Sequence, residues 1–217
     1  MQKCLNAVMV ALLATVGFSS IALTTEEEQG ADYLRKQSES DKAFAIFERI
    51  LNLTEASDRK KNILQIETAY REIIEHYPAA SIAEECYWRL ALIYLHEYDP
   101  PQFRKAETLY REFMQKYPES GDRYVFADAI SESYHEAHEW ERLMKFHSPV
   151  IKEFIEGEKL LRPTELFMYS EAKFHMGDLA EAQKGYKIVI TLFPKSEESQ
   201  KAKKMLDIIN EKKAPVL

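Results

Sequence analysis

Apolar residues return every three or four positions along most of this chain, which is the period of an amphipathic α-helix. No turn dipeptide joins two alternating runs of the kind that form a β-hairpin. The pattern therefore predicts an all-α protein of about eight to ten helices. The predicted helices span residues 26–37, 40–53, 57–76, 81–97, 102–116, 122–137, 139–155, 162–176, 179–192 and 196–212.

Three aromatic–proline pairs close three of these helices: Tyr77-Pro78, Tyr117-Pro118 and Phe193-Pro194. The first two pairs lie 40 residues apart, and the third follows after a further 76, which is twice 38. Another aromatic residue precedes the aromatic of each pair by seven positions; these three are Tyr70, Tyr110 and Tyr186. A repeat of this length predicts stacked helical hairpins, because one hairpin cannot bury its apolar face alone. This architecture favours binding over catalysis.

Local signals support these helix boundaries. Each proline lacks an N–H group and restricts the residue before it, so it ends its helix. Ser120 and Ser196 each follow a repeat proline by two residues and can cap the next helix. Asp178 follows Gly177, so the glycine ends one predicted helix and the aspartate caps the next.

Recurring side chains give each hairpin the same spacing. The first helices carry Tyr87, Leu90, Ala91 and Tyr94, then Ile130, Ser131 and Tyr134, then Leu166, Tyr169, Ser170 and Phe174. The second helices carry Ala106, Tyr110 and Pro118, then Ala182, Tyr186 and Pro194. In these positions the chain resembles the tetratricopeptide repeat family over roughly residues 57–212. The resemblance implies a right-handed superhelix of antiparallel helix pairs, an α-solenoid, that binds other proteins.

The repeats are longer than usual and one is altered. The period is 37–40 residues, and the extra residues fall at turns such as Asp99-Pro100-Pro101. In the third unit, Leu143, His147 and Phe154-Ile155 replace the expected alanine, aromatic and aromatic–proline residues. An aromatic–proline ending followed by a serine looks like the branch of the family found in periplasmic proteins, among them the BamD outer-membrane assembly lipoprotein and the YbgF partner of the Tol–Pal system. The resemblance implies complex assembly without catalytic residues.

The first residues have the pattern of an export signal: Lys3, an apolar run over residues 5–18, and the small residues of Ser20-Ile21-Ala22. We expect cleavage after Ala22 and a periplasmic or secreted protein. The alternative is an uncleaved membrane anchor over residues 5–23. A lipoprotein is not predicted, because Cys4 precedes the apolar run. The expected organisation is a signal peptide (1–22), N-terminal helices that cap the solenoid (23–56), and repeats with a C-terminal capping helix (57–212).

Composition excludes several classes of function. The chain has a net charge of -7, or -8 without residues 1–22, so it lacks the basic surface that nucleic acid requires. An anionic membrane surface would not attract it either, so membrane association is expected only through partners or an uncleaved signal. Neither GxGxxG nor GxxxxGK[ST] occurs. Cys86 is the one cysteine after the signal, and helical spacing predicts that it is a small buried residue.

A partner is predicted to bind the face of each first helix that does not pack against the second. This face is acidic and aromatic, so we expect a basic or amphipathic segment of another envelope protein, with two aromatic residues as anchors. The anchors are Trp88 and Phe167. The alternative is an ordinary solvated surface. The predicted contact residues are Trp88, Leu92, His96, Asp128, Glu132, His135, Phe167, Glu171 and His175.

Catalytic chemistry finds little support in the sequence. His135 and His138 lie three positions apart on one helical face, which is half of a metal site but not the HExxH spacing of zinc proteases. No GxSxG nucleophile motif occurs. We therefore expect no catalytic residues, no metal and no cofactor. A metal- or ligand-dependent enzyme with its site around His135 is the alternative from a different class.

Overall fold

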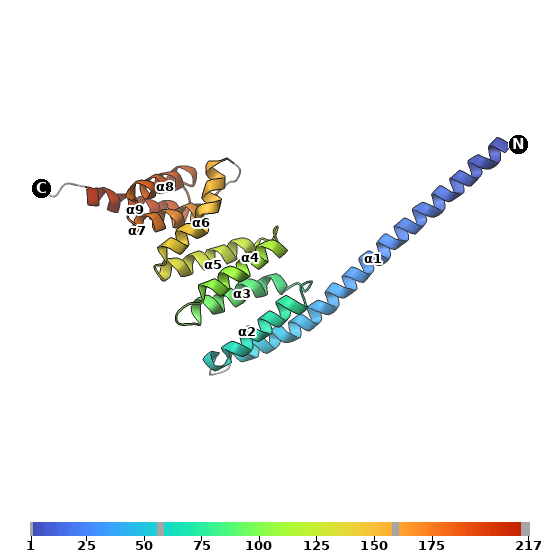
Figure 1. Ribbon diagram of the computed structural model, residues 1–217, viewed down its shortest axis with the longest axis horizontal. Helices are drawn as coiled ribbons and strands as arrows, with labels where there is room; N and C mark the ends of the chain where they lie inside the picture. Colours follow the sequence, from blue (N-terminus) through green and yellow to red (C-terminus); the bar gives the residue numbers. More distant parts are fainter. Residues whose placement is uncertain (1, 56–58, 158–160, 214–217) are drawn as a thin grey trace. The chain divides into compact units, whose positions relative to one another are not determined.

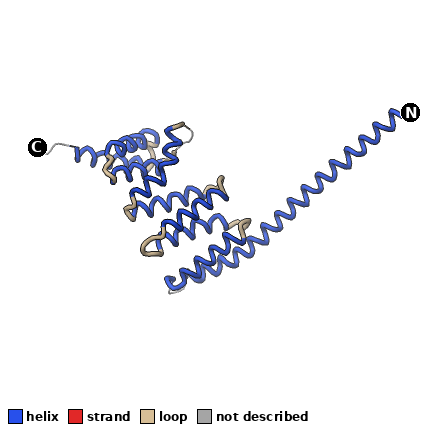
Figure 2. Tube along the Cα trace, viewed as in Figure 1, coloured by secondary structure: helices blue, strands red, loops and turns tan. Residues whose placement is uncertain are grey.

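The computed structural model describes residues 2–55, 59–157 and 161–213, and within these ranges every regular element is an α-helix (Figure 2). This confirms the all-α prediction. Figure 1 labels the nine helices of the described residues. They are α1 (Gln2–Glu55), α2 (Arg59–His76), α3 (Ala83–His96), α4 (Phe103–Lys116), α5 (Asp122–Glu136), α6 (Trp140–Ile155), α7 (Pro163–His175), α8 (Leu179–Leu192) and α9 (Glu197–Lys213).

The first helix differs from the prediction. The sequence predicted separate helices over 26–37 and 40–53, whereas α1 runs without a break from Gln2 to Glu55. Nothing at the predicted break stops a helix: Ser38 and Glu39 are neither proline nor glycine, and the Gln37 side chain donates a hydrogen bond to Asp41 Oδ1 across it (3.1 Å). No helix in the described part of the chain has the length and sustained apolar character that crossing a bilayer requires.

The aromatic–proline pairs end their helices as predicted. Tyr77, Tyr117 and Phe193 each stand one residue beyond a helix, α2, α4 and α8. Each donates its backbone N–H to the carbonyl four residues before, at 3.0, 2.8 and 2.9 Å. The proline that follows has no N–H with which to continue this ladder. The repeated motif is therefore a repeated way to end the second helix of a hairpin.

Side-chain caps begin the following helices. The Glu181 amide donates to Asp178 Oδ1 (3.3 Å) at the start of α8, and the Ser199 amide donates to Ser196 Oγ (3.1 Å) at the start of α9. Both caps were predicted from the sequence. Gly177, between α7 and α8, has φ +87°, a left-handed conformation that glycine adopts without strain.

The chain divides into two units, Met1–Ile93 and Tyr94–Leu217, with the boundary inside α3. In the first unit α1 packs on α2, and the ring of Phe47 lies edge-on to Tyr70 at 6.4 Å. Cys86 is fully buried and makes no disulfide, as predicted. Burial and the nearby charge of Glu85 raise the pKa of the Cys86 thiol to about 12. This cysteine is therefore a packing residue and not a reactive thiol.

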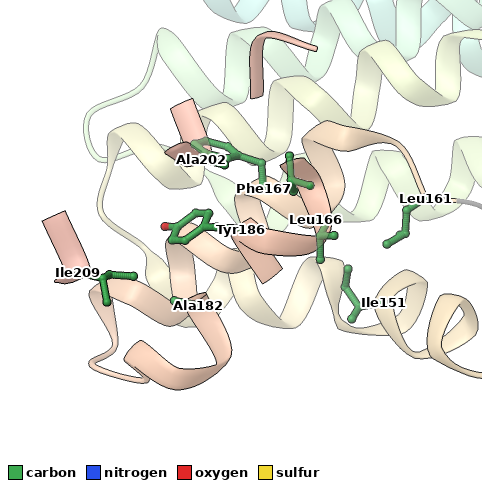
Figure 3. Packing of buried hydrophobic residues seen from close by; sticks show 9 residues of the cluster. Ile151, Leu161, Leu166, Phe167, Ala182, Tyr186, Ala202 and Ile209 are labelled. Carbon is green, nitrogen blue, oxygen red and sulfur yellow. The ribbon is translucent and has the colours of Figure 1, made fainter. Parts of the chain in front are cut away.

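In the second unit each helix packs mainly on its neighbours in sequence: α4 on α5, α5 on α6, and so on to α9. Figure 3 shows the apolar cluster that α6 to α9 enclose, with side chains of α7 and α8 at its centre. Burial of each large apolar side chain contributes about 1.5–3 kcal/mol. The buried members of the cluster are Ile151, Leu161, Leu166, Phe167, Ala182, Tyr186, Val189, Ala202 and Ile209.

Helices α7 and α8 approach most closely where small residues face each other. Ser170 of α7 is fully buried, as the sequence predicted for a position of close helix contact. It faces Gly185 of α8: a Cβ atom added to Gly185 would lie 2.0 Å from Ser170 Oγ and 3.2 Å from Ser170 Cβ. The Ser170 hydroxyl is held by its hydrogen bond to the Leu166 carbonyl (2.7 Å). There is accordingly no room for a methyl group at position 185.

Gly185→Ala is therefore expected to lower the free energy of unfolding of the second unit by about 1–3 kcal/mol, although alanine favours a helix more than glycine does. In a chain that already carries Ser170→Gly the same change is expected to be neutral or to stabilise by up to about 1 kcal/mol. Gly121→Ala is the control, since nothing lies within 4 Å of an added Cβ there. Urea unfolding compares the natural chain with these four variants, and an equal loss in both backgrounds would contradict the close contact.

Candidate functional site

The predicted contact residues fall in both units. Trp88 and Leu92 belong to the first unit, and the other seven belong to the second. Trp88 is half-buried, and the guanidinium of Arg89 lies 4.9 Å from the centre of its ring. His96, at the end of α3, is exposed.

Two of the predicted residues lie in the core and not on a surface. Phe167 is 7% exposed and its ring packs 5.9 Å from that of Tyr186. Glu171 is 6% exposed and accepts a hydrogen bond from the Tyr186 hydroxyl. The physical reason is the long Tyr186 side chain of α8, which crosses to this side of α7. Phe167 therefore offers no ring for a partner, and the assignment of Phe167 and Glu171 to the contact surface is corrected here.

Asp128 is engaged within the chain. Its two carboxylate oxygens accept hydrogen bonds from Arg162 Nη2 and Nη1, at 2.8 and 2.9 Å. Arg162 Nε also donates to Glu165 Oε1 (3.2 Å). Burial disfavours the charged guanidinium, but the hydrogen bonds and charges of Asp128 and Glu165 outweigh it and raise the pKa of Arg162. This bidentate pair ties α5 to the start of α7 and is structural.

The structure does bring three of the predicted residues together. His135 Nε2 lies 3.5 Å from Glu171 Oε2, and the His175 ring stacks on Trp140, with centroids 3.9 Å apart and planes 6° from parallel. His135 and His138 also contact Trp140, at 5.2 and 5.3 Å. We call His135, His138, Trp140 and His175 the His/Trp cluster. It lies where α5 and α7 end and α6 begins.

Two exposed carboxylates lie near this cluster. Glu132 and Glu136 of α5 are exposed, and neither forms an ion pair with another described residue. Among the described residues, no group of three or more His, Cys, Asp or Glu side chains is placed to hold a metal ion. The surface around the cluster therefore offers aromatic edges and the carboxylates of Glu132 and Glu136, which suit a cationic or amphipathic segment.

A groove of about 750 Å³ lies on another side of the second unit, lined by α4, α5 and α6 and the start of α7. We call it the α4/α6 groove. Its aromatic lining includes Tyr110, Tyr124 and Phe146, and its apolar lining includes Met114 and Val150. Sequence reasoning placed no site here. The altered third unit was the one feature of the sequence that could have indicated this groove, because His147 and Pro149 of α6 both line it.

A partly buried polar contact supports one wall of the groove. The Tyr134 hydroxyl and Arg142 Nη1 both donate to Glu107 Oε1, at 2.5 and 2.8 Å. Burial, and then the hydrogen bond to Glu107, raise the pKa of Tyr134. These three residues join α4, α5 and α6. The charges of Glu107 and Arg142 are paired with each other in this contact and are not free for a ligand.

The floor of the groove contains a buried histidine. His147 is 2% exposed, and its Nε2 lies 2.9 Å from Ser131 Oγ. The Ser131 hydroxyl donates its one hydrogen to the Ala127 carbonyl (2.8 Å), so Nε2 is the donor in the contact with Ser131. Burial, and to a lesser degree the positive charge of Arg162, lower the pKa of His147 to about 3. This imidazole is neutral and serves as a core residue.

The fold and the surfaces together define a class of protein. It is an array of helical hairpins in which each helix packs mainly on its neighbours along the chain, and its grooves and exposed helix faces are open to other molecules. More particularly, comparison with known families matches residues 166–196 to the tetratricopeptide repeat. The match covers most of α7, all of α8 and Phe193-Pro194, and thus the predicted repeat residues Leu166, Ser170 and Tyr186. Comparison with curated proteins finds no match. A tetratricopeptide repeat implies protein partners in general.

Proposed function

We propose that this chain is an exported scaffold of the cell envelope that holds other envelope proteins together, as in the assembly of outer-membrane or other envelope complexes. The tetratricopeptide repeat at residues 166–196, within an array of helical hairpins, is the observation that carries the proposal. Repeats of this kind present extended surfaces to proteins and do not enclose a reaction centre.

The surface around the His/Trp cluster supports a basic or amphipathic partner segment. Glu132 and Glu136 are exposed carboxylates without an ion pair to a described residue, although the charge of Lys201 acts on Glu132 from nearby. The half-buried Trp140 supplies an aromatic edge. Aromatic residues dominate the energy of protein interfaces, and complementary charges speed association. The sequence pattern of Lys3 and the apolar run over residues 5–18 supports export.

Crosslinking in cells tests the contact. A photoreactive amino acid at position 132 is expected to give an adduct of one discrete mass, while the same group at Lys187, exposed on α8, is expected to give none. Replacing the exposed Glu132 and Glu136 together by alanine is expected to abolish capture of that partner and to leave far-UV circular dichroism unchanged. Capture that persists in the double variant would refute the contact surface.

The mass of the protein recovered from cells tests the export proposal. Cleavage after Ala22 is expected to shorten the chain by about two kilodaltons. Recovery of the full mass from the membrane fraction would instead favour the anchored alternative, and recovery of the full mass from the cytosol would contradict both.

A further inference from the structure

We propose that the α4/α6 groove is a second protein-binding site, and that it binds an acidic peptide segment with apolar or aromatic side chains. Two arginines without carboxylate partners, Arg111 and Arg123, carry the proposal. The chain as a whole has a net charge of -7, whereas the groove is lined by five cationic residues and only three acidic ones. The cationic residues are Arg111, Arg123, Arg142, Lys145 and Arg162, and the acidic ones are Glu107, Glu153 and Glu165.

Two of these arginines keep their charge available. Arg111 Nη2 donates to Thr108 Oγ1 (3.1 Å), and Arg123 donates to the Pro118 carbonyl (2.8 Å) and to the Tyr124 hydroxyl (2.9 Å). All of these acceptors are neutral, and neither guanidinium is paired with a carboxylate of the described chain. By contrast, Arg142, Lys145 and Arg162 are bound to carboxylates. The partners of Lys145 and Arg162 are Glu141 and Asp128, which lie outside the lining. Arg111 and Arg123 are therefore the groups that an acidic ligand would meet.

Aromatic surfaces stand beside these charges. Tyr124 lines the groove, and the guanidinium carbons of Arg123 and Arg162 both lie 4.6 Å from the centre of its ring. These two contacts hold the ring in place. Tyr110 and Phe146 pack 5.4 Å apart in the wall. Arginine forks bind carboxylates with two parallel hydrogen bonds, and aromatic walls bind apolar side chains. A volume of about 750 Å³ suits a few consecutive residues of a peptide.

This groove borders the surface around the His/Trp cluster, because Arg142 and Lys145 line both the groove and the hollow beside His138 and Trp140. The groups proposed to meet the two partners are nevertheless different. On α5, the groove is lined by Arg123, Tyr124, Ala127 and Tyr134, whereas Glu132 stands roughly a quarter turn or more around the helix from each of them. The two faces also differ in sign, since one carries unpaired carboxylates and the other unpaired arginines. A partner of the groove therefore has chemistry opposite to that of the first partner.

Fluorescence anisotropy with a labelled peptide of about twelve residues, built from Glu, Phe and Leu, tests the proposal on the purified chain. The matched peptide has Gln in place of every Glu. We expect the acidic peptide to bind about tenfold more tightly than the neutral one at low salt, and this preference to shrink as salt screens the charges. A photoreactive group on the acidic peptide is expected to label residues of α4, α5 or α6 that line the groove.

Arg111→Glu with Arg123→Glu is expected to weaken binding of the acidic peptide about tenfold or more. Lys203→Glu with Lys204→Glu makes the same charge change on exposed positions of α9 and is expected to change binding less than about twofold. Because Arg123 also contacts Tyr124, Arg111→Glu alone provides a second variant whose exposed side chain is not needed for folding. It is expected to weaken binding about threefold.

Three results would overturn the proposal. The first is equal binding of the acidic and neutral peptides, and the second is an equal loss in the arginine and lysine variants. The third is binding only to vesicles that contain phosphatidylglycerol, lost in the arginine variants, which would assign the groove to anionic lipid. Crosslinking at position 132 tests the proposed function separately, so either site can fail without the other.

Discussion

Replacing Tyr186 by alanine is expected to lower the free energy of unfolding of the second unit by about 3–5 kcal/mol. Tyr186 is fully buried in α8, and its ring packs on Phe167 of α7. Removing the ring leaves a cavity between the two helices and takes the hydrogen-bond donor away from the buried Glu171 carboxylate. Both effects act in the same direction.

The hydroxyl and the ring can be separated by Tyr186→Phe, which keeps the packing and is expected to cost about 1–3 kcal/mol. Leu192→Ala is the control on the same helix, since Leu192 is 49% exposed, and it is expected to cost less than about 0.5 kcal/mol. The chain has two tryptophans. With Trp88 replaced by phenylalanine, the fluorescence of Trp140 reports the second unit alone during urea unfolding. A loss below 1 kcal/mol for the alanine variant would contradict the packing.

Acid is expected to destabilise the second unit through His147. The pKa of His147 is about 3 in the folded state and about 6.5 in an unfolded chain. Above pH 6.5 the imidazole is neutral in both states, so its full stabilising effect is present. As pH falls from 6.5 to 3, His147 binds a proton in the unfolded state but stays neutral in the folded state. The free energy of unfolding therefore falls by up to about 1.4 kcal/mol per pH unit.

His147→Phe removes this titration and restores an aromatic residue at the repeat position occupied by Tyr110 and Tyr186 in other hairpins. The variant is expected to unfold like the natural chain near pH 7 and to lose stability less steeply between pH 6.5 and 3. Ser131 keeps its hydrogen bond to the Ala127 carbonyl in both proteins. His96→Gln, at an exposed position, is the control. Identical slopes in the natural chain and the His147→Phe variant would show that the buried imidazole is protonated in the folded state.

Most of the fold could be predicted because its signals are local. Proline and the aromatic before it determine where α2, α4 and α8 end, and Asp178 and Ser196 determine where α8 and α9 begin. The break predicted between residues 37 and 40 was wrong, because α1 is continuous there. Ser38 and Glu39 are polar, but polar residues do not stop a helix.

The surfaces were harder to predict because they depend on how far side chains reach from a neighbouring helix. Helical spacing placed Phe167 and Glu171 on the outer face of α7. Spacing within α7 carries no information about Tyr186 of α8, whose side chain contacts both residues and buries them. In the same way the α4/α6 groove depends on the space between two second helices. The unusual residues of the third unit, His147 and Pro149, marked that region without revealing its shape.

Because each helix from α4 to α9 touches chiefly its neighbours in sequence, the second unit has no central element on which all the others depend. Such a molecule can fray from its end: α9 can detach and leave the layers beneath it intact, at the cost of the contacts of Ala202 and Ile209. Proteases would then meet the carboxyl-terminal helix first, and trimming would proceed inward one layer at a time.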